Sequence, residues 1–198
     1  MQERSTRTRA EIIDAAQRLF GHNSYENTSV AEICQQANVS KGAFYHHFPT
    51  KHDLFLELLD QWLDGIDMGL QVSRQQVDNV PQALLSMARS TEAVFEMADG
   101  RLPMFLEFWS QARLDPAVWE ATIAPYRRYQ DFFAELLEEG IEQGDVRPIE
   151  PQVGARMLVA LAVGLLLQSV LEPTEEHWAE VVEKSVDILL QGLIRRSA

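Results

Sequence analysis

Residues 28–51 read TSVAEICQQANVSKGAFYHHFPTK, and this stretch decides how the first part of the chain folds. Residues 29–32 (SVAE) have the form of a capping box, in which a serine hydroxyl and a glutamate carboxylate bind free amides at the start of a helix. Asn38 tolerates a left-handed backbone, so it predicts a tight turn after this helix. Ser40 then caps a second short helix, which Pro49 ends. The stretch therefore predicts a helix, a turn and a helix.

The apolar residues of this stretch predict which helix faces are buried. They recur three and four positions apart, so they can pack against a preceding helix that we expect over residues 5–20. The second helix would then turn Lys41, Gly42, Tyr45 and His46 away from the core. This is the helix-turn-helix arrangement, in which the second helix enters the major groove of DNA. The buried set is Val30, Ile33, Cys34, Ala37, Val39, Phe44 and Phe48.

The residue types on the outward face suit contact with DNA. Lys41 can donate to guanine or to phosphate, and Gly42 lets the backbone approach the duplex closely. Tyr45 and His46 offer hydrogen bonds to phosphate and apolar ring faces to thymine methyl groups. Two further phosphate contacts are expected at the starts of the flanking helices, where free amides attract anions, namely at Thr28 and Lys51.

The first 55 positions resemble the DNA-binding domain of TetR-type transcriptional regulators. The family pattern is T-[ST]-x-x-[DE]-I-A, a G-V-S turn, K-G-x-x-Y-x-H-F and x-x-K-x-x-L, and this sequence departs from it at Cys34 and Asn38. The matching positions are Thr28-Ser29, Glu32-Ile33, Val39-Ser40-Lys41-Gly42, Tyr45, His47-Phe48, Lys51 and Leu54. The resemblance implies operator contacts, with most sequence preference carried between Lys41 and His46. The predicted DNA-binding residues are Thr28, Ser40, Lys41, Gly42, Ala43, Tyr45, His46, His47 and Lys51.

The rest of the chain shows helical periodicity and no sustained alternation of β-branched residues, so we expect an all-α fold of about nine helices. A fourth helix should begin near Thr50, and it is apolar over so wide an arc that it must be packed on several sides. We predict a helix-turn-helix DNA-binding domain at residues 1–52 and a ligand-binding and dimerisation domain at residues 53–198. Breaks between the later helices are expected at residues 79–81, 98–103, 115–116, 144–148 and 172–174.

Charge is divided unevenly along the chain. The 198 residues carry a net charge of −13, which taken alone argues against a nucleic-acid partner. Residues 1–52 nevertheless hold six basic and five acidic residues, a net of +1, so the remainder carries −14. Only the near-neutral N-terminal part needs to meet phosphates. Arg4, Arg7 and Arg9 could form a basic arm along the DNA or a disordered terminus, and the sequence does not choose.

Several features bear on the compartment and on metal binding. Cys34 is the only cysteine, which excludes an internal disulfide and a Cys-rich metal site and fits a cytoplasmic protein. The start of the chain is polar, with no secretory signal, and the most apolar run, residues 157–167, is shorter than the ~18 residues that cross a bilayer. His46, His47 and His52 lack companions that would complete a ligand set, so we expect no metal and no cofactor.

The resemblance also implies what the C-terminal part does. Family members bind a small molecule there and form a homodimer through the last two helices, which correspond to about residues 151–171 and 175–193 here. Small residues in the first of these helices would allow close packing in a four-helix bundle. The segments most similar to the AcrR-like and BetI-like branch, which includes choline-responsive and fatty-acid-responsive regulators, are Phe108-Trp109, Asp115-Pro116 and residues 164–168 (GLLLQ).

Aromatic and methionine side chains are concentrated between residues 87 and 133, as suits an apolar effector pocket. Because most aromatic residues at helical spacing belong to a core, the resemblance rather than the spacing favours a pocket. Glu96 or Glu107 would suit a cationic ligand and Arg113 an anionic one, so the charge of the effector is open. The predicted ligand-binding residues are Met87, Phe95, Met104, Phe105, Phe108, Trp109, Arg113, Tyr126, Tyr129, Phe133 and Gln168.

The sequence favours a ligand-responsive regulator over an enzyme or a helical adaptor. It contains no G-x-S-x-G, phosphate-loop or H-E-x-x-H motif, and Cys34 falls on the buried side of its helix, so no catalytic residue is expected. A helical adaptor would instead use the two terminal helices to bind other proteins. We expect a homodimeric repressor that a small hydrophobic or amphipathic effector releases from a palindromic double-stranded DNA operator. The sequence leaves the effector, the operator sequence and the sign of regulation open.

Overall fold

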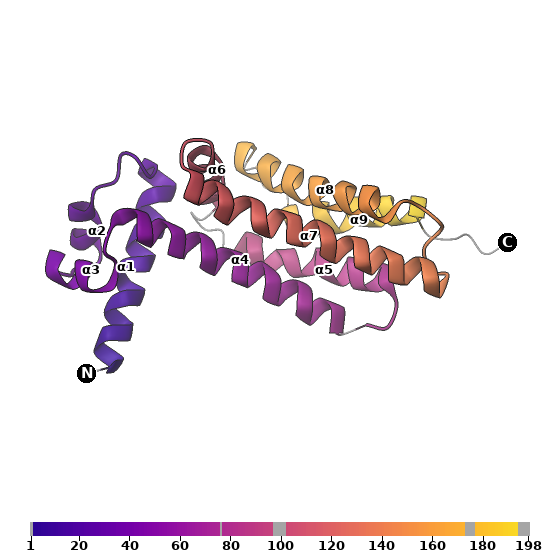
Figure 1. The fold of residues 1–198 in the computed structure, drawn as a ribbon, viewed down its shortest axis with the longest axis horizontal. Helices are drawn as coiled ribbons and strands as arrows, with labels where there is room; N and C mark the ends of the chain where they lie inside the picture. The colour runs from indigo at the N-terminus through magenta and orange to yellow at the C-terminus, as the bar shows by residue number, and fades with distance from the viewer. Residues whose placement is uncertain (1, 76, 97–101, 173–176, 194–198) are drawn as a thin grey trace. The chain divides into compact units, whose positions relative to one another are not determined.

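A computed structural model describes residues 2–75, 77–96, 102–172 and 177–193. Over these residues the chain forms nine α-helices and no strand, which confirms the predicted all-α fold (Figure 1). The helices are α1 (Gln2–Asn23), α2 (Val30–Gln36), α3 (Lys41–His47), α4 (Lys51–Gln75), α5 (Val80–Glu96), α6 (Leu102–Ala112), α7 (Pro116–Gln143), α8 (Pro151–Leu171) and α9 (Trp178–Leu193).

Local sequence sets the ends of α2 and α3. The Ser29 hydroxyl accepts a hydrogen bond from the Glu32 amide at 3.2 Å, and the Glu32 carboxylate accepts one from the Ser29 amide at 2.7 Å, which completes the predicted capping box. Asn38 has a φ of 53° and so makes the predicted left-handed turn. The Ser40 hydroxyl accepts a hydrogen bond from the Ala43 amide at 3.1 Å and caps α3. The expected caps and turn are therefore confirmed.

The helices of the predicted helix-turn-helix belong to a compact unit formed by residues 1–63 and 98–122. α1 packs on α2, α3 and α6, so α6 shares this unit with the helix-turn-helix. The ring of Phe108 in α6 lies 4.9 Å from that of Phe55 in α4, centroid to centroid. The largest fully buried side chains of the unit are Ile12, Phe20, Ile33, Phe44, Leu54, Phe55, Leu58, Leu59 and Val118.

Two polar contacts tie α6 and the start of α7 to the rest of this unit. The Tyr25 amide, in the turn between α1 and α2, donates a hydrogen bond to the Glu107 carboxylate at 2.9 Å. His52 Nδ1 in α4 lies 3.6 Å from the carboxylate of Asp115, which precedes α7. Glu107 therefore has a partner inside the protein, which limits its use as a counter-ion for a cationic ligand.

The second unit comprises residues 64–97 and 123–198. α5 packs against α9, and α9 packs against α8. Leu137 of α7 and Leu190 of α9 are among its most deeply buried side chains. The other buried apolar residues of this core include Val80, Ala83, Leu84, Met87, Ala88, Leu136, Val146, Leu158, Leu165, Val182, Val186 and Leu193.

The structure differs from the sequence prediction at some boundaries. α1 continues past the expected end at Phe20 to Asn23, because the backbone becomes left-handed only at Ser24, where φ is 67°. The same helix extends to Gln2, so the described part of the arginine-rich N-terminus is helical. α6 and the start of α7 also group with the helices of the predicted helix-turn-helix, and the domain boundary between residues 52 and 53 stays a prediction.

By length and composition alone, α8 is apolar enough to cross a membrane, with a mean hydropathy of 1.9 over its most apolar window. A helix that is apolar on all sides is also typical of a soluble core. One side of α8 buries Leu158, Val159 and Leu165, while Val153 and Met157 are about half exposed. The hydropathy of α8 is therefore weak evidence for a membrane span, and its exposed side needs another explanation.

Candidate functional site

The outer face of α3 presents the residue types predicted to contact DNA. Lys41, Gly42 and His46 are exposed, and Tyr45 has an exposed fraction of 53%. These residues lie at positions one, three and four apart, so they share one face of the helix. The opposite face holds the fully buried Phe44, whose ring makes an edge contact with that of Tyr45 at 5.3 Å. The contact with the buried Phe44 ring thus holds Tyr45 in place on the exposed, polar face of α3.

No contact within the described protein requires a glycine at position 42. A Cβ atom built at this position would meet only the Ser40 hydroxyl oxygen, at 3.8 Å, which is an ordinary contact. Glycine also weakens the interior of a helix relative to alanine. The fold does not explain the glycine, whereas the close approach of a partner to the backbone would.

Two of the predicted DNA contacts on α3, Ala43 and His47, are partly buried rather than exposed. Burial lowers the pKa of His47, and the nearby charges of His46 and Arg9 lower it further. His47 is therefore neutral at physiological pH. It can offer a hydrogen bond, but it does not add a positive charge to the surface.

Thr28 and Lys51, which are predicted to contact phosphate at the starts of the flanking helices, make contacts within the protein. Thr28 is 1% exposed, and its hydroxyl lies 2.8 Å from the carbonyl oxygen of Ser24. Lys51 Nζ donates to the carbonyl oxygens of Tyr25 and Thr28 at 2.8 and 2.9 Å and lies 4.1 Å from the centroid of the Tyr25 ring. In this conformation the Thr28 hydroxyl and two of the three donors of the Lys51 ammonium stabilise the turn before α2, and the contact of these two positions with phosphate stays a prediction.

The basic residues of α1 are also partly engaged. Arg9 forms an ion pair with Glu57 at 2.6 Å and stacks 5.2 Å from the centroid of the Phe48 ring. Arg7 pairs with Glu11 on the helix surface at 2.8 Å. Arg9 therefore joins α1 to α4, whereas an exposed i to i+4 pair such as that of Arg7 opens at little cost when a phosphate competes.

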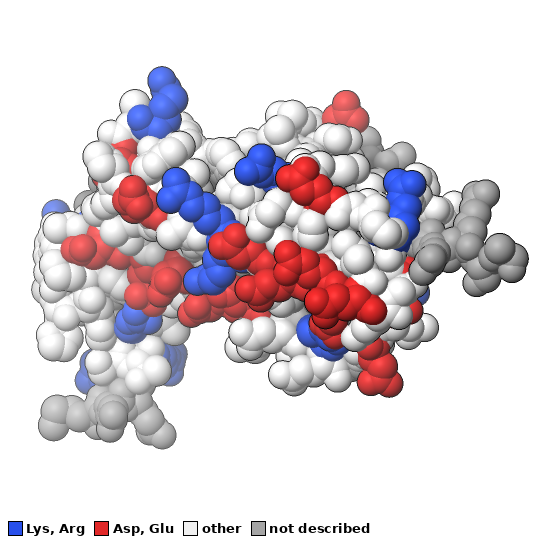
Figure 2. Space-filling model, turned by 45° about the vertical axis from the view of Figure 1, so that its right-hand side comes forward, with Lys and Arg blue, Asp and Glu red and all other residues white. Residues whose placement is uncertain are grey.

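Acidic side chains outnumber basic ones on part of the surface. The face drawn in Figure 2 shows many Asp and Glu side chains and fewer Lys and Arg. α7 contributes an acidic stripe to the surface of the second unit, with exposed carboxylates four, three and four positions apart. The stripe consists of Asp131, Glu135, Glu138 and Glu142.

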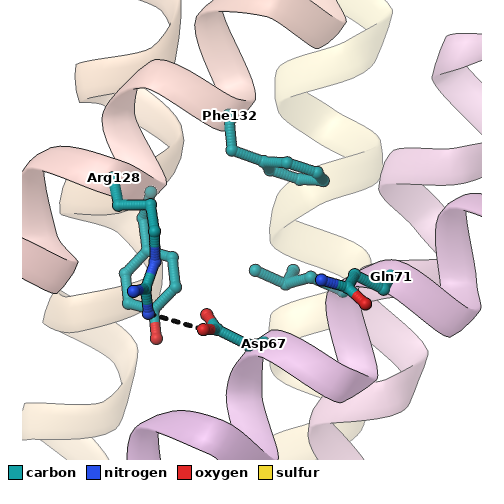
Figure 3. A pocket seen from close by; sticks show the side chains of 6 residues that line it. Asp67, Gln71, Arg128 and Phe132 are labelled. Atoms are coloured by element: carbon teal, nitrogen blue, oxygen red, sulfur yellow. Dashed lines mark hydrogen bonds and ion pairs between the residues drawn. The ribbon is translucent and has the colours of Figure 1, made fainter.

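The second unit contains a hollow of about 170 Å³ between α4 and α7. Asp67, Leu70 and Gln71 line it from α4, and Arg128, Tyr129 and Phe132 line it from α7. The Arg128 guanidinium donates a hydrogen bond to the Asp67 carboxylate, and Phe132 extends over the hollow on the side away from Asp67 (Figure 3). The site therefore joins an ion pair to an apolar wall, as small-molecule sites commonly do.

The structure brings only one of the predicted ligand-binding residues, Tyr129, to this hollow. Met87 is packed in the core of the second unit, and Phe108 is buried against Phe55 and Trp62 in the first. The side chains of Phe95, Met104 and Phe105 lie outside the described residues. The others are dispersed: Trp109, Arg113 and Gln168 are exposed, and Tyr126 and Phe133 are partly buried.

The remaining lining residues were missed because each one is ordinary in sequence. Asp67 and Gln71 lie four positions apart and so share one face of α4, but this helix carries several other acidic and polar residues, so their spacing did not single them out. Their partner Arg128 is 61 positions away, so the pairing cannot be read from either helix alone. Among the described residues, no group of three His, Cys, Asp or Glu side chains is placed to hold a metal ion.

Comparison with known proteins assigns the family. Residues 12–58 match the pattern of the bacterial regulatory proteins of the tetR family. Residues 83–195, more than half of the chain, match the C-terminal domain of BetI-type transcriptional repressors. The chain belongs to the TetR family. The family and the BetI-like branch predicted from sequence are thereby confirmed, and this TetR-family protein is a transcriptional regulator rather than an enzyme.

Curated relatives of this TetR-family regulator are themselves transcriptional regulators or receptors. The A-factor receptor protein of Streptomyces griseus is 30% identical over 85% of this chain, which spans 57% of the length of that receptor. The repressor AcnR of Corynebacterium glutamicum is 25% identical over 98% of this chain and 96% of its own. The regulator UidR of Escherichia coli is 24% identical, covering 84% of this chain and 83% of its own.

Solved structures share the fold of the regulator. A transcriptional regulator from Saccharomonospora viridis, in complex with choline, superposes with a TM-score of 0.83 at 20% identity over 95% of this chain and 98% of its own. PfmR of Thermus thermophilus, a TetR-family regulator, gives a TM-score of 0.78 at 26% identity over 93% and 99% of the two chains. These similarities confirm the fold class across nearly the whole chain.

Proposed function

We propose that this TetR-family regulator is a repressor that a small effector releases from a palindromic DNA operator. The exposed face of α3 carries the proposal, because Lys41, Gly42, Tyr45 and His46 offer charge, close approach and hydrogen bonds on one rigid surface. The recognition helix of a helix-turn-helix reads base edges from its N-terminal residues. Two such helices in a dimer would address half-sites ~34–36 Å apart, or farther apart on a bent operator.

The proposed protein partner is a second copy of the chain, bound through α8 and α9. Met157 and Leu167 are exposed on α8, and Ile188 of α9 has an exposed fraction of 70%. A Cβ atom at Gly164 would meet no atom within 4 Å in the single chain, so this side of α8 is open to a close neighbour. An isologous contact of two helices from each copy forms a four-helix bundle and brings two α3 helices to one operator.

The proposed effector site is the hollow between α4 and α7. The choline complex of the Saccharomonospora viridis regulator supports a small-molecule effector for this fold. One continuous helix, α4, carries both Lys51, which holds the turn before α2, and Asp67, which lines the hollow. An effector that favours a non-binding state by about 5.5 kcal/mol would move the population from 1:99 to 99:1.

The test of operator binding starts with the selection of sequences from random double-stranded DNA by the purified full chain. We expect enrichment of a near-palindrome, and fluorescence anisotropy at moderate salt should show that Tyr45→Ala relaxes its sequence preference. Gly42→Ala should fold normally and bind at least tenfold more weakly, on the order of the 1–3 kcal/mol that a good base contact contributes. Gly65→Ala, at an exposed helical glycine of α4, is the matched control and should bind like the unmodified protein. A chain that enriched no sequence over random DNA would contradict the proposal.

A further inference from the structure

Tyr25, in the turn before α2, has its backbone held by two side chains of opposite charge. Its amide donates a hydrogen bond to the Glu107 carboxylate of α6 at 2.9 Å. Its carbonyl oxygen accepts a hydrogen bond from Lys51 Nζ of α4 at 2.8 Å. Hydrogen bonds to charged groups are stronger than neutral ones. Two helices from distant parts of the chain, 82 and 26 positions away, therefore fix this turn.

The conformation of the turn explains why such restraint is needed. Ser24 has a φ of 67°, which is uncommon for a residue other than glycine. A strained backbone persists only where its surroundings hold it in place, and such residues often occur at functional sites. The turn leads within four positions to Ser29, the N-cap of α2, and α2 packs against α3. A shift of Tyr25 would therefore be carried to both helices of the predicted helix-turn-helix.

α6 presents the Glu107 carboxylate from a well-packed position. The neighbouring Phe108 is 3% exposed, and its ring lies 4.9 Å from that of Phe55, which in turn lies 4.5 Å from the Tyr25 ring. Gln111, which is 7% exposed, donates a hydrogen bond to the same carboxylate oxygen at 3.3 Å. These contacts orient the carboxylate, so the Tyr25 amide meets an acceptor that is already in place.

We propose that Glu107 is a positioning residue for operator recognition. Its carboxylate holds the Tyr25 amide and thereby sets where the turn places α2 and α3, without contact between Glu107 and DNA. Without this hydrogen bond, α3 would occupy its binding position for only a fraction of the time, and the apparent operator affinity would fall by that fraction. The role in recognition rests on the proposed function, whereas the restraint of the turn does not.

Electrostatics alone predicts the opposite effect of losing this carboxylate. The chain carries a net charge of −13, and DNA is a polyanion. Removing one negative charge should therefore leave operator binding unchanged or make it tighter. Weaker binding after removal of the Glu107 charge would thus point to position rather than charge.

Three substitutions of Glu107 separate the reach of the side chain from its charge. Fluorescence anisotropy measures their affinity for the near-palindrome selected by the unmodified chain. Glu107→Met keeps the length and removes both oxygens, so it should bind about tenfold more weakly or worse, as expected for loss of a charged hydrogen bond. Glu107→Gln keeps an acceptor oxygen at the same reach and should bind within about threefold of the unmodified protein. Glu107→Asp keeps the charge but withdraws it by one methylene, and should bind about fivefold more weakly or worse.

Glu139 of α7, in the second unit, provides the matched control. It accepts hydrogen bonds from Arg74 at 2.5 Å and from Gln143, four positions later, at 2.9 Å. Glu107 likewise accepts from a distant donor and from a glutamine four positions later. Glu139→Met removes the same charge and a similar pair of hydrogen bonds away from the turn, so operator affinity should not fall.

Amide hydrogen exchange, followed by NMR without DNA, tests the restraint of the turn. The Tyr25 amide should exchange about tenfold faster or more in Glu107→Met, because it loses its acceptor. The Ala43 amide, which donates to the Ser40 hydroxyl within α3, should keep its rate. An unchanged Tyr25 rate would overturn the restraint.

The two readouts also separate this proposal from the proposed function. If the unmodified chain selects an operator and Glu107→Met binds it as tightly, the regulator proposal stands and the positioning role fails. If the chain selects no operator, the proposed function fails and the recognition role with it, while the Tyr25 exchange rate still decides whether Glu107 restrains the turn. Should Glu107→Met not fold, tighter binding by Glu107→Asp than by Glu107→Gln would overturn the positioning role.

Discussion

At the residue scale, Lys51 has two backbone acceptors inside the protein and the face of one ring. Its Nζ atom donates to the carbonyl oxygens of Tyr25 and Thr28, and the Tyr25 ring stacks against it. A charged hydrogen bond contributes more than a neutral one, and removing the donor leaves both carbonyl groups without it. Lys41, by contrast, is exposed at the start of α3.

We therefore expect the two lysines to respond differently to removal of their charge. Lys51→Met should lower the free energy of unfolding by about 1–3 kcal/mol, because the turn before α2 loses its donor. Lys41→Met should change that free energy by less than about 0.5 kcal/mol, as exposed substitutions do. Urea unfolding followed by circular dichroism measures both.

The salt dependence of operator binding provides the second readout of this pair. The slope of log K against log salt falls by about 0.9 for each phosphate that the protein no longer neutralises, so Lys41→Met should lower it by about 2 for a dimer. Lys51→Met should leave the slope unchanged. A stable Lys51→Met protein with a reduced slope would show instead that Lys51 binds phosphate.

At the scale of the element, the sequence correctly predicted the features that are formed by residues close to one another in the chain. The capping box at Ser29 and Glu32, the turn at Asn38 and the cap at Ser40 involve residues no more than three positions apart, and all are present. The burial of Thr28 and the pairing of Asp67 with Arg128 depend on how distant segments pack. A single sequence does not determine such packing, so sequence located α3 and missed the hollow.

Two glycines in the long helices show whether side-chain packing or intrinsic helix propensity decides how a Gly→Ala substitution changes the free energy of unfolding. Gly140 of α7 is buried, and a Cβ atom there would lie 2.7 Å from Val146 Cγ2 and 3.0 Å from Val80 Cβ. Both valines are fully buried and stiff at χ1, so neither can yield without moving the backbone. Gly140→Ala should therefore lower the free energy of unfolding by about 1–3 kcal/mol in urea unfolding.

Gly65→Ala is the matched control within α4. A Cβ atom at Gly65 would meet nothing within 4 Å, so the same substitution should stabilise the helix by up to about 1 kcal/mol. Opposite signs for Gly140→Ala and Gly65→Ala would confirm that packing decides the cost. A neutral Gly140→Ala would mean that the contact between the start of α5 and the end of α7 is looser than described.

At the scale of the whole molecule, an acidic regulator has to bind an acidic polymer. The chain carries a net charge of −13, and several of its few basic residues near α3 are already paired within the protein. Long-range attraction to DNA is therefore weak, and the proposed operator binding would rely on close contacts from two copies of α3. Loss of the dimer should then cost more affinity than loss of any single surface charge.

The dimer is tested by placing a charge on the exposed apolar side of α9. Ile188 is 70% exposed in the single chain, so Ile188→Glu should leave the helical circular dichroism spectrum unchanged. Each isoleucine buried at an interface contributes about 1.5–3 kcal/mol, so two substitutions should weaken the dimer at least about a hundredfold. Sedimentation velocity should show monomers, and operator affinity should fall with them. Met68→Glu on α4, at a residue 67% exposed, is the matched control and should remain dimeric. If the Ile188→Glu protein remained dimeric, the dimer interface would not include this side of α9.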